Sequence, residues 1–143
     1  MNMSLDLETN NFENEVSFPS VFSNISYSEK IIHELEKKIS ISEEKYGNIL
    51  LSLSEAINNA IVHGNKFNPE KNVKVLYKYS NRLLLIEVKD QGEGFDPNQI
   101  ANPTSAENIE NLYGRGVYII ISLSDKVEFE YDKGQLVRIM FNI

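Results

Sequence analysis

Apolar residues recur at helical spacing in two stretches of the first half of the chain. The first stretch predicts a helix over about 27–39 and contains Ile31, Ile32, Leu35 and Ile39. Ser26 and Glu29 stand three residues apart at its start, which is the spacing of a capping box. We therefore expect the Ser26 side chain to cap this helix.

The second stretch predicts the longest helix, over about 43–63. Ser42 can cap its first turn, and Gly64 can end it. One face of this helix is apolar and is made of Tyr46, Leu50, Leu53, Ile57, Ala60 and Ile61. Glu55 and Asn59 lie four residues apart on a different face, so their side chains are neighbours outside the apolar stripe.

Alternation of apolar and polar residues predicts strands in the rest of the chain. It indicates two pairs, over 73–79 and 83–89 and over 127–131 and 137–143. Asn81-Arg82 turns the chain in the first pair, and Asp132-Lys133-Gly134 turns it in the second. The alternation continues to Asp90, which it places on the buried face of the sheet.

The two remaining segments have weaker patterns. Residues 1–14 are expected to be a loose extension of a domain over 15–143, in which residues 15–18 form an edge strand that stops at Pro19. Residues 91–113 are rich in Gly, Pro, Asn and Ser, and a loop of this length inside a compact domain is usually functional or disordered. Propensity alone then predicts a strand over 117–121.

Composition and charge narrow the class of protein. A chain of 143 residues, with 41% apolar and 24% charged residues, fits one compact globular domain. Its 14 basic and 21 acidic residues give a net charge of −7, which disfavours binding to a nucleic-acid backbone or an anionic membrane. The absence of Cys excludes a thiolate metal site. The N-terminus has no basic segment followed by an apolar one, so we expect no signal peptide and a cytoplasmic protein.

Glu55 and Asn59 are the first candidates for chemistry. A carboxylate can act as a general base, and an amide oxygen can ligate Mg²⁺ or orient a water molecule. The alternative is a solvated helix face without chemistry, and the spacing by itself does not decide between the two.

Asp90 is the second candidate, because a carboxylate on a buried face must find hydrogen-bond donors. Gly92 and Gly94 follow it and allow another molecule to approach the backbone closely. A ligand that offers an amino group would satisfy Asp90. The alternative is a turn in which Asp90 accepts hydrogen bonds from local amides.

Gly114-Arg115-Gly116 is the third candidate. If these residues begin a helix, its free amides and the Arg115 charge would attract phosphate, whereas the alternative is a plain turn. His63, at the end of the long helix, is interpreted as a cap or packing residue rather than a metal ligand.

Taken in order, the three candidates resemble the nucleotide-binding boxes of one superfamily. SEAINNAIVHGN (54–65), DQGEGFD (90–96) and GRGVYIIISLSD (114–125) resemble the N, G1 and G2 boxes of the ATP-binding superfamily of gyrase, histidine kinases and MutL. The compact spacing is most similar to bacterial anti-sigma-factor serine kinases, over about residues 15–143. The resemblance implies a Bergerat-type ATP-binding fold, an α/β two-layer sandwich in which helices cover one face of a mixed, mainly antiparallel sheet.

The resemblance also implies a role for each residue of the first two boxes. Glu55 matches the family's catalytic glutamate, and Asn59 matches its Mg²⁺-binding asparagine. Asp90 matches the aspartate that takes the amino group of adenine. Gly92 and Gly94 match the glycines that open the adenine pocket.

In the third box, Gly114 and Gly116 match the phosphate-side glycines, with Arg115 between them, at the start of a helix rather than the strand that propensity favours. Residues 95–113 correspond to a lid over the nucleotide. The chain departs from the family at one position: many relatives have threonine after the glycine of the last hairpin, where this chain has Gln135.

By resemblance, the function is that of an ATP-dependent protein serine kinase. It would use ATP and Mg²⁺, phosphorylate an anti-sigma antagonist protein and sequester a sigma factor, as a homodimer by analogy and without nucleic-acid or membrane partners. The alternative is an ATP-binding interaction module that regulates a partner without phosphotransfer. The catalytic part of a histidine kinase is disfavoured, because nothing in the sequence resembles a phosphoacceptor helix pair.

Overall fold

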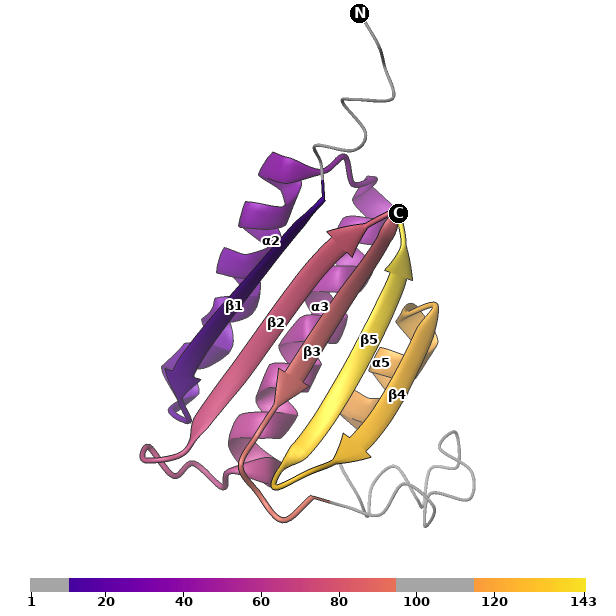
Figure 1. Cartoon of the computed structure of the whole chain (residues 1–143). Coiled ribbons are helices and arrows are strands. Elements are labelled where there is room, and N and C mark those ends of the chain that lie inside the picture. Colours follow the sequence, from indigo (N-terminus) through magenta and orange to yellow (C-terminus); the bar gives the residue numbers. More distant parts are fainter. Residues whose placement is uncertain (1–10, 95–114) are drawn as a thin grey trace, which may run out of the picture.

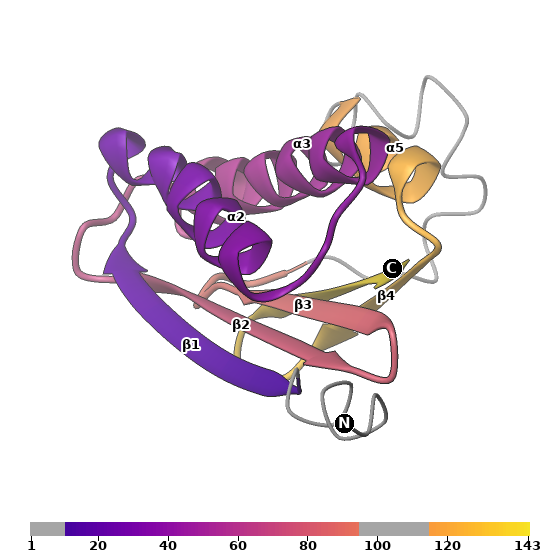
Figure 2. The same cartoon turned by 90° about the horizontal axis from the view of Figure 1, so that it is seen from above.

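The computed structural model describes residues 11–94 and 115–143, which form two layers. A five-stranded sheet makes one layer, and helices on one of its faces make the other (Figures 1 and 2). The strand order is β1-β2-β3-β5-β4. This architecture confirms the predicted two-layer class.

The strands are β1 (Phe12–Pro19), β2 (Asn72–Ser80), β3 (Leu83–Lys89), β4 (Lys126–Tyr131) and β5 (Gln135–Asn142). The helices are the 3-10 helix η1 (Phe22–Ser26), α2 (Tyr27–Lys38), α3 (Glu43–Asn59), the π-helical turn η2 (Ala60–Gly64) and α5 (Arg115–Leu123).

The expected mixed sheet is corrected, because every pairing among the described strands is antiparallel. Hairpins join β2 to β3 and β4 to β5, and a hairpin makes its strands antiparallel. Two successive helices, α2 and α3, connect β1 to β2. Their reversal brings the chain back to the end of the sheet where β1 finished, so this pair is antiparallel as well.

The N-terminal part differs from the prediction in two details. β1 is the expected edge strand, but it begins at Phe12, so residues 12–14 belong to the sheet rather than to the extension. Ser26 does not cap α2: its backbone is helical, and its hydroxyl donates to the carbonyl oxygen of Ser23. The reason is that η1 runs directly into α2, so the helix has no extended residue at which a capping box could form.

Helix α3 confirms the predicted long helix and its cap. The Ser42 hydroxyl accepts a hydrogen bond from the Lys45 amide at 3.2 Å. The helix ends at Gly64 as expected, although its last turn is the π-helical η2. A π turn within an α-helix is rare and frequently marks a functional site.

Residues 117–121 lie in helix α5, so the propensity-based strand is wrong and the helix implied by the family resemblance is confirmed. Val117 and Ile120 are buried, whereas Tyr118 is exposed. This spacing of three suits a helix with one face against its neighbours, and α5 packs on α3. Tertiary packing therefore overrides the β propensity of Val and Ile.

The core lies between the sheet and the helices. Its fully buried large side chains include Phe18, Ile31, Ile32, Leu35, Ile49, Leu53, Ile57, Ile61, Tyr77, Leu84, Ile86 and Phe141. In the part of the chain that the structure describes, no helix is long and apolar enough to cross a membrane.

Candidate functional site

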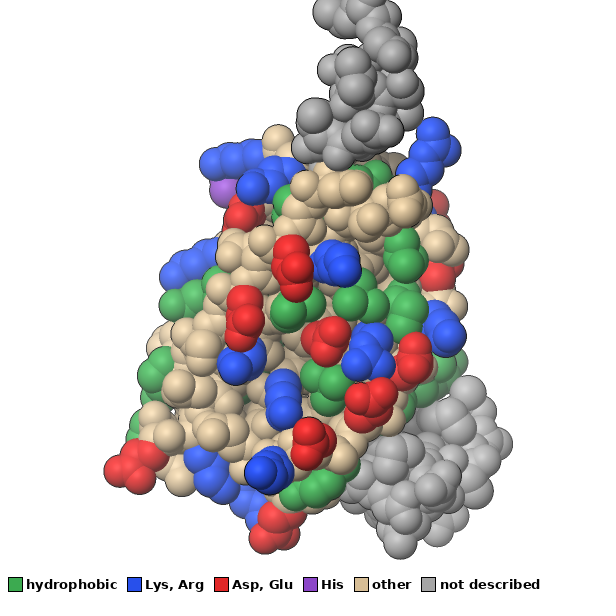
Figure 3. Space-filling view, viewed as in Figure 1, with side chains coloured by type: hydrophobic (Ala, Val, Ile, Leu, Met, Phe, Trp, Pro, Cys, Tyr) green, Lys and Arg blue, Asp and Glu red, His purple; other side chains and the backbone are tan. Residues whose placement is uncertain are grey.

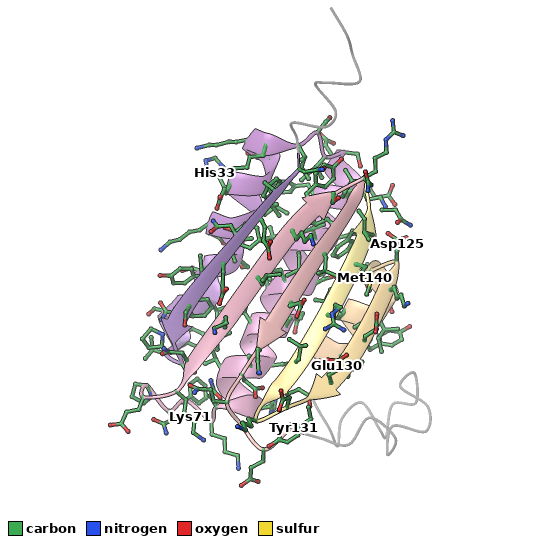
Figure 4. The ribbon with its side chains drawn as sticks, viewed as in Figure 1. His33, Lys71, Asp125, Glu130, Tyr131 and Met140 are labelled. Atoms are coloured by element: carbon green, nitrogen blue, oxygen red, sulfur yellow. The ribbon has the colours of Figure 1, made fainter. Side chains whose placement is uncertain are left out.

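Four segments from distant parts of the sequence meet at one end of the molecule. They are the end of α3 with η2, the end of β3, the start of α5 and the β4–β5 turn (Figure 1). Figure 4 shows Tyr131 beside that turn, at the same end of the sheet as Lys71. The described candidate residues of the three motifs therefore lie at one end.

A small cavity joins the first two motifs. Its polar lining consists of Asn59, Asp90 and Gln135, and its apolar lining consists of Ala56, Ala60, Val88, Val117, Ile120, Phe129 and Val137. The volume is about 20 Å³, which is room for roughly one water molecule. An adenine ring would fit here only after the cavity widens.

Asp90 lies on the buried face, as the strand pattern predicts, and is only 4% exposed. Its Oδ1 accepts hydrogen bonds from the amides of Gly92 and Gln135, both at 2.9 Å. No described residue donates to Oδ2. Burial raises the pKa of this carboxyl, while the two amides and the charge of Lys71 act in the opposite direction. Local amides thus satisfy half of the carboxylate and leave one oxygen for a ligand.

Three glycines pack against the Asp90 segment without leaving room for a side chain. A Cβ on Gly64 would lie 2.0 Å from Oδ2 of Asp90, and a Cβ on Gly134 would lie 2.0 Å from its carbonyl oxygen. A Cβ on Gly92 would lie 2.1 Å from the carbonyl oxygen of Gly64. The close approach predicted at Gly92 is therefore made, in this structure, by the backbone of η2. Gly94 has a positive φ of 73° and lies beside the Tyr131 ring.

Glu55 and Asn59 face the start of α5. A Cβ on Gly116 would lie 2.8 Å from Oε2 of Glu55 and 3.1 Å from Oδ1 of Asn59. Asn59 is only 7% exposed, yet no described residue makes a hydrogen bond with its carboxamide. An amide oxygen that makes no hydrogen bond to a described residue, beside the Glu55 carboxylate and a helix start, is suited to a Mg²⁺ ion that carries phosphate. The solvated-face alternative does not describe Asn59.

The remaining candidates are less defined. Arg115 is the first residue of α5. Gly114 and the expected lid over 95–113 lie outside the described residues. His63 lies in η2 and is exposed. Within 11–94 and 115–143, no group of three or more His, Asp or Glu side chains could hold a metal ion, so a cation here would need ligands such as Asn59 and phosphate oxygens.

Asn65 was not singled out by the sequence, although it is a structural hub of the site. Its Nδ2 donates to Oγ of Ser20 at 2.8 Å and to the carbonyl oxygen of Asn72 at 3.0 Å. Its Oδ1 accepts from the Gln91 amide at 2.7 Å. Asn65 thus fixes the segment after Asp90 against the end of the long helix. The only sequence signal is an Asn directly after a helix-ending glycine, where such side chains often bond to backbone.

Gln135, at the position where the family resemblance implies threonine, is buried. Its backbone forms two hydrogen bonds with Asp90. The Gln135 amide donates to Oδ1 of Asp90 at 2.9 Å, and the Asp90 amide donates to the carbonyl oxygen of Gln135 at 3.0 Å. Its Nε2 donates to the carbonyl oxygen of Glu130 at 3.0 Å. The backbone at this position therefore supports Asp90 whatever side chain it carries.

Comparisons with known proteins agree with this arrangement. The chain is 27% identical over 129 residues to the "Anti-sigma F factor" of Clostridium acetobutylicum, with 88% of this chain and 89% of that protein covered. It is 27% identical over 106 residues to the "Serine-protein kinase RsbW" of Listeria innocua, with 70% and 68% covered.

Solved structures share the fold at low sequence identity. The RsbU and RsbW domains of a Mycobacterium tuberculosis protein match with a TM-score of 0.67 and 12% identity, over 92% of this chain and 32% of that longer chain. The catalytic domain of the histidine kinase ThkA matches with a TM-score of 0.55 and 13% identity, over 90% of this chain and 97% of that domain. The family model for the histidine kinase-like ATPase domain matches residues 23–141. With that match over most of its length, the chain belongs to the histidine kinase-like ATPase domain family.

Proposed function

We propose that this protein is an ATP-dependent protein serine kinase that acts as an anti-sigma regulatory factor. Its substrate would be a serine of an anti-sigma antagonist protein, and it would also sequester a sigma factor. The observation that carries the proposal is that Asp90, Asn59 and Glu55 converge on one end of the molecule, around the cavity and the start of α5. The names of the relatives support the choice of partners.

In this proposal Asp90 recognises the base. Its Oδ1 is held by two amides, and Oδ2 accepts a hydrogen bond from the exocyclic amino group of adenine. Adenine presents an amino donor at the position where guanine presents a carbonyl oxygen, so the site would select ATP over GTP. Residues such as Val88 and Val137 supply the apolar walls.

Asn59 and the start of α5 hold the phosphate end. A bound Mg²⁺ would neutralise phosphate charge, and phosphoryl transfer depends mainly on such neutralisation and on positioning. The Oδ1 of Asn59 is the amide oxygen available to it, and Gly116, at the start of α5, lies against the Asn59 and Glu55 side chains. Glu55, one helical turn before Asn59, then accepts the proton of the incoming serine hydroxyl.

The decisive experiment compares phosphoserine formation by the wild type and by Glu55→Ala, with Mg-ATP and an anti-sigma antagonist protein as the substrate. A general base acts mainly in the transition state, so Glu55→Ala should keep most ATP affinity and lose phosphotransfer by about 10²–10⁴-fold. Asn59→Ala should instead weaken the binding of Mg-ATP. Glu44→Ala, on an exposed turn of the same helix, is the matched control and should keep full activity.

Two results would contradict the proposal. If the wild type binds the antagonist and ATP but transfers no phosphate, the protein is an interaction module rather than a kinase. If Glu55→Ala transfers phosphate at the wild-type rate, Glu55 is not the base.

Base recognition has its own test, in the thermal unfolding of the protein with ATP or GTP. A ligand at about 100 times its dissociation constant adds roughly 2.7 kcal/mol of stability. For a domain of this size, that raises the melting temperature by about 5–10 °C. ATP should give this shift with the wild type, and Asp90→Asn should abolish it. Equal stabilisation by GTP would show that Asp90 does not read adenine.

A further inference from the structure

The face of the sheet that the helices leave open carries an unusual pair of lysines. Side chains alternate along each strand, so Lys74 of β2 and Lys89 of β3 point to this open face while Val73 and Val88 are buried. The two lysines lie directly opposite each other in the strand register. Like charges in this position destabilise a strand pair unless an opposite charge lies nearby.

These lysines line a pocket at the end of the open face. The pocket has a volume of about 350 Å³ and is lined by Ser17, Asn72, Lys74, Lys89, Asp90, Gln91 and Lys133. Asp90 is the one acid in this lining, but it is 4% exposed and its carboxylate is held by buried amides. It therefore does little to neutralise the three ammonium groups.

Neighbouring acids do not neutralise the pocket either. Lys74 pairs with Glu15 at 3.4 Å, and both side chains are about half exposed, so this pair is weak. Within 11–94 and 115–143, neither Lys89 nor Lys133 forms an ion pair. Two lysines without an ion pair, Lys89 and Lys133, thus lie at one pocket in a chain whose net charge is −7.

Other basic side chains of the open face lie close to acids. In the middle of the sheet, the Nε atom of Arg138 lies 3.6 Å from Oε1 of Glu87. Its Nη1 atom lies 3.7 Å from Oε2 of Glu128 and 3.1 Å from Oε1 of Glu130. At the far end, Lys126 lies 3.7 Å from Glu128. Figure 3 views this face directly and shows basic and acidic side chains interspersed across it, including at its lower end.

We propose that the pocket binds a short acidic segment of a partner protein, with two or three of its carboxylates between Lys74, Lys89 and Lys133. Lysines act as mobile point charges, which suit a flexible acidic peptide better than the fixed fork of arginine that selects phosphate. The net charge of −7 disfavours a long nucleic-acid backbone, so a short acidic segment that contacts only this pocket fits the charge pattern best. The pocket shares Asp90 with the proposed adenine site, whereas its lysines Lys74 and Lys89 lie on the opposite face of the sheet from Glu55 and Asn59.

The test uses a fluorescein-labelled hexaglutamate peptide, titrated with the full-length protein and followed by fluorescence anisotropy at low salt. The wild type should bind, and binding should weaken as salt is added, because exposed charges are screened. The double variant Lys89→Glu/Lys133→Glu should bind at least tenfold more weakly. The matched control is Lys78→Glu/Lys126→Glu, which makes the same charge change at the other end of the same sheet face and should bind within about twofold of the wild type.

Three outcomes would overturn the proposal: no binding by the wild type, equal weakening in the two double variants, or tighter binding of a single-stranded thymidine octanucleotide than of hexaglutamate. Equal weakening would mean a general charge effect, and preference for the oligonucleotide would mean a phosphate ligand. Circular dichroism and the ATP-dependent thermal shift verify folding of each variant. Lys89→Gln/Lys133→Gln replaces the charge reversal if that variant does not fold, and it should also lose binding.

Discussion

The two ends of helix α3 differ in how completely the protein satisfies its own polar groups. At the N-terminal end, Ser42 caps the helix and Lys45 pairs with Asp125 at 3.5 Å. At the C-terminal end, the helix changes to a π turn, and the Asn59 carboxamide, in a residue that is 7% exposed, makes no hydrogen bond to a described residue. The first end therefore serves stability, whereas the second leaves a carboxamide that the proposed nucleotide site can use.

The largest difference between the two ends of α3 is expected when one glycine at each end is replaced by alanine. Gly64→Ala would place its Cβ 2.0 Å from Oδ2 of Asp90, and overpacking of this kind costs about 1–3 kcal/mol. It should also remove most of the stabilisation by ATP. Gly47→Ala adds a Cβ with nothing within 4 Å, so it should stabilise the helix by about 0.5–1 kcal/mol and keep the ATP effect. Thermal unfolding with and without Mg-ATP measures both, and similar behaviour of the two variants would refute the contrast.

Asn65→Ala should lower the free energy of unfolding by about 2 kcal/mol, because it leaves several buried backbone and hydroxyl groups without their partner. The segment after Asp90 would lose its anchor, so the ATP-dependent shift should shrink as well. Urea unfolding measures the first effect, and ATP titration measures the second. Ser20→Ala removes one of the same hydrogen bonds and should have a smaller effect on both. If Asn65→Ala binds ATP with unchanged affinity, this residue has only a structural role.

Acidification should weaken ATP binding through Asp90. Burial raises its pKa in the folded protein above the ordinary value of 3.8, and an adenine amino group needs the ionised form. ATP affinity should therefore fall as the pH drops through this raised pKa, by up to about tenfold, or 1.4 kcal/mol, per pH unit. The stability of the free protein depends on pH in the opposite direction. The contribution that comes from the raised pKa of Asp90 is present at low pH and is lost as the pH rises through that pKa. Calorimetric titrations of the wild type and Asp90→Asn separate this effect from protonation of ATP itself, because only the wild type should show it.

At the other end of α3, the smallest effect is expected. Ser42→Ala removes the cap and should cost about 1 kcal/mol of stability. The melting temperature should drop equally with and without Mg-ATP, since the cap lies far from the site. A selective loss of ATP binding in this variant would show that the two ends are coupled.

The sequence predicts those features that depend on local pattern. The alternation in β2 and β3 places Asp90 on the buried face, and Ser42 caps α3, because both depend on residues close in sequence. Ser26 fails as a cap because a preceding 3-10 helix, which the spacing does not reveal, changes its backbone. Helix α5 contradicts the propensity of its own residues, and only the order of the three motifs indicated it.

The missed part of the site is non-local. Asn65 bonds to residues 45 positions before it and 26 positions after it, and neither a period nor a motif encodes such partners. The sequence likewise does not predict the contact of Gly64 with Asp90. A glycine after a helix is expected to end it, and only the folded structure brings Asp90 close enough to require it.

The packing of Gly64, Gly92 and Gly134 around Asp90 has a consequence for the order of folding. The three contacts join segments that are 26 to 44 residues apart along the chain, and β5 must pair with β3 before Gly134 can reach Asp90. Closing loops of this length costs entropy that local helices and hairpins do not have to overcome. We therefore expect the helices and the β2–β3 hairpin to form early and the nucleotide end to assemble last, so that a partly folded chain would have helices and hairpins but no binding site.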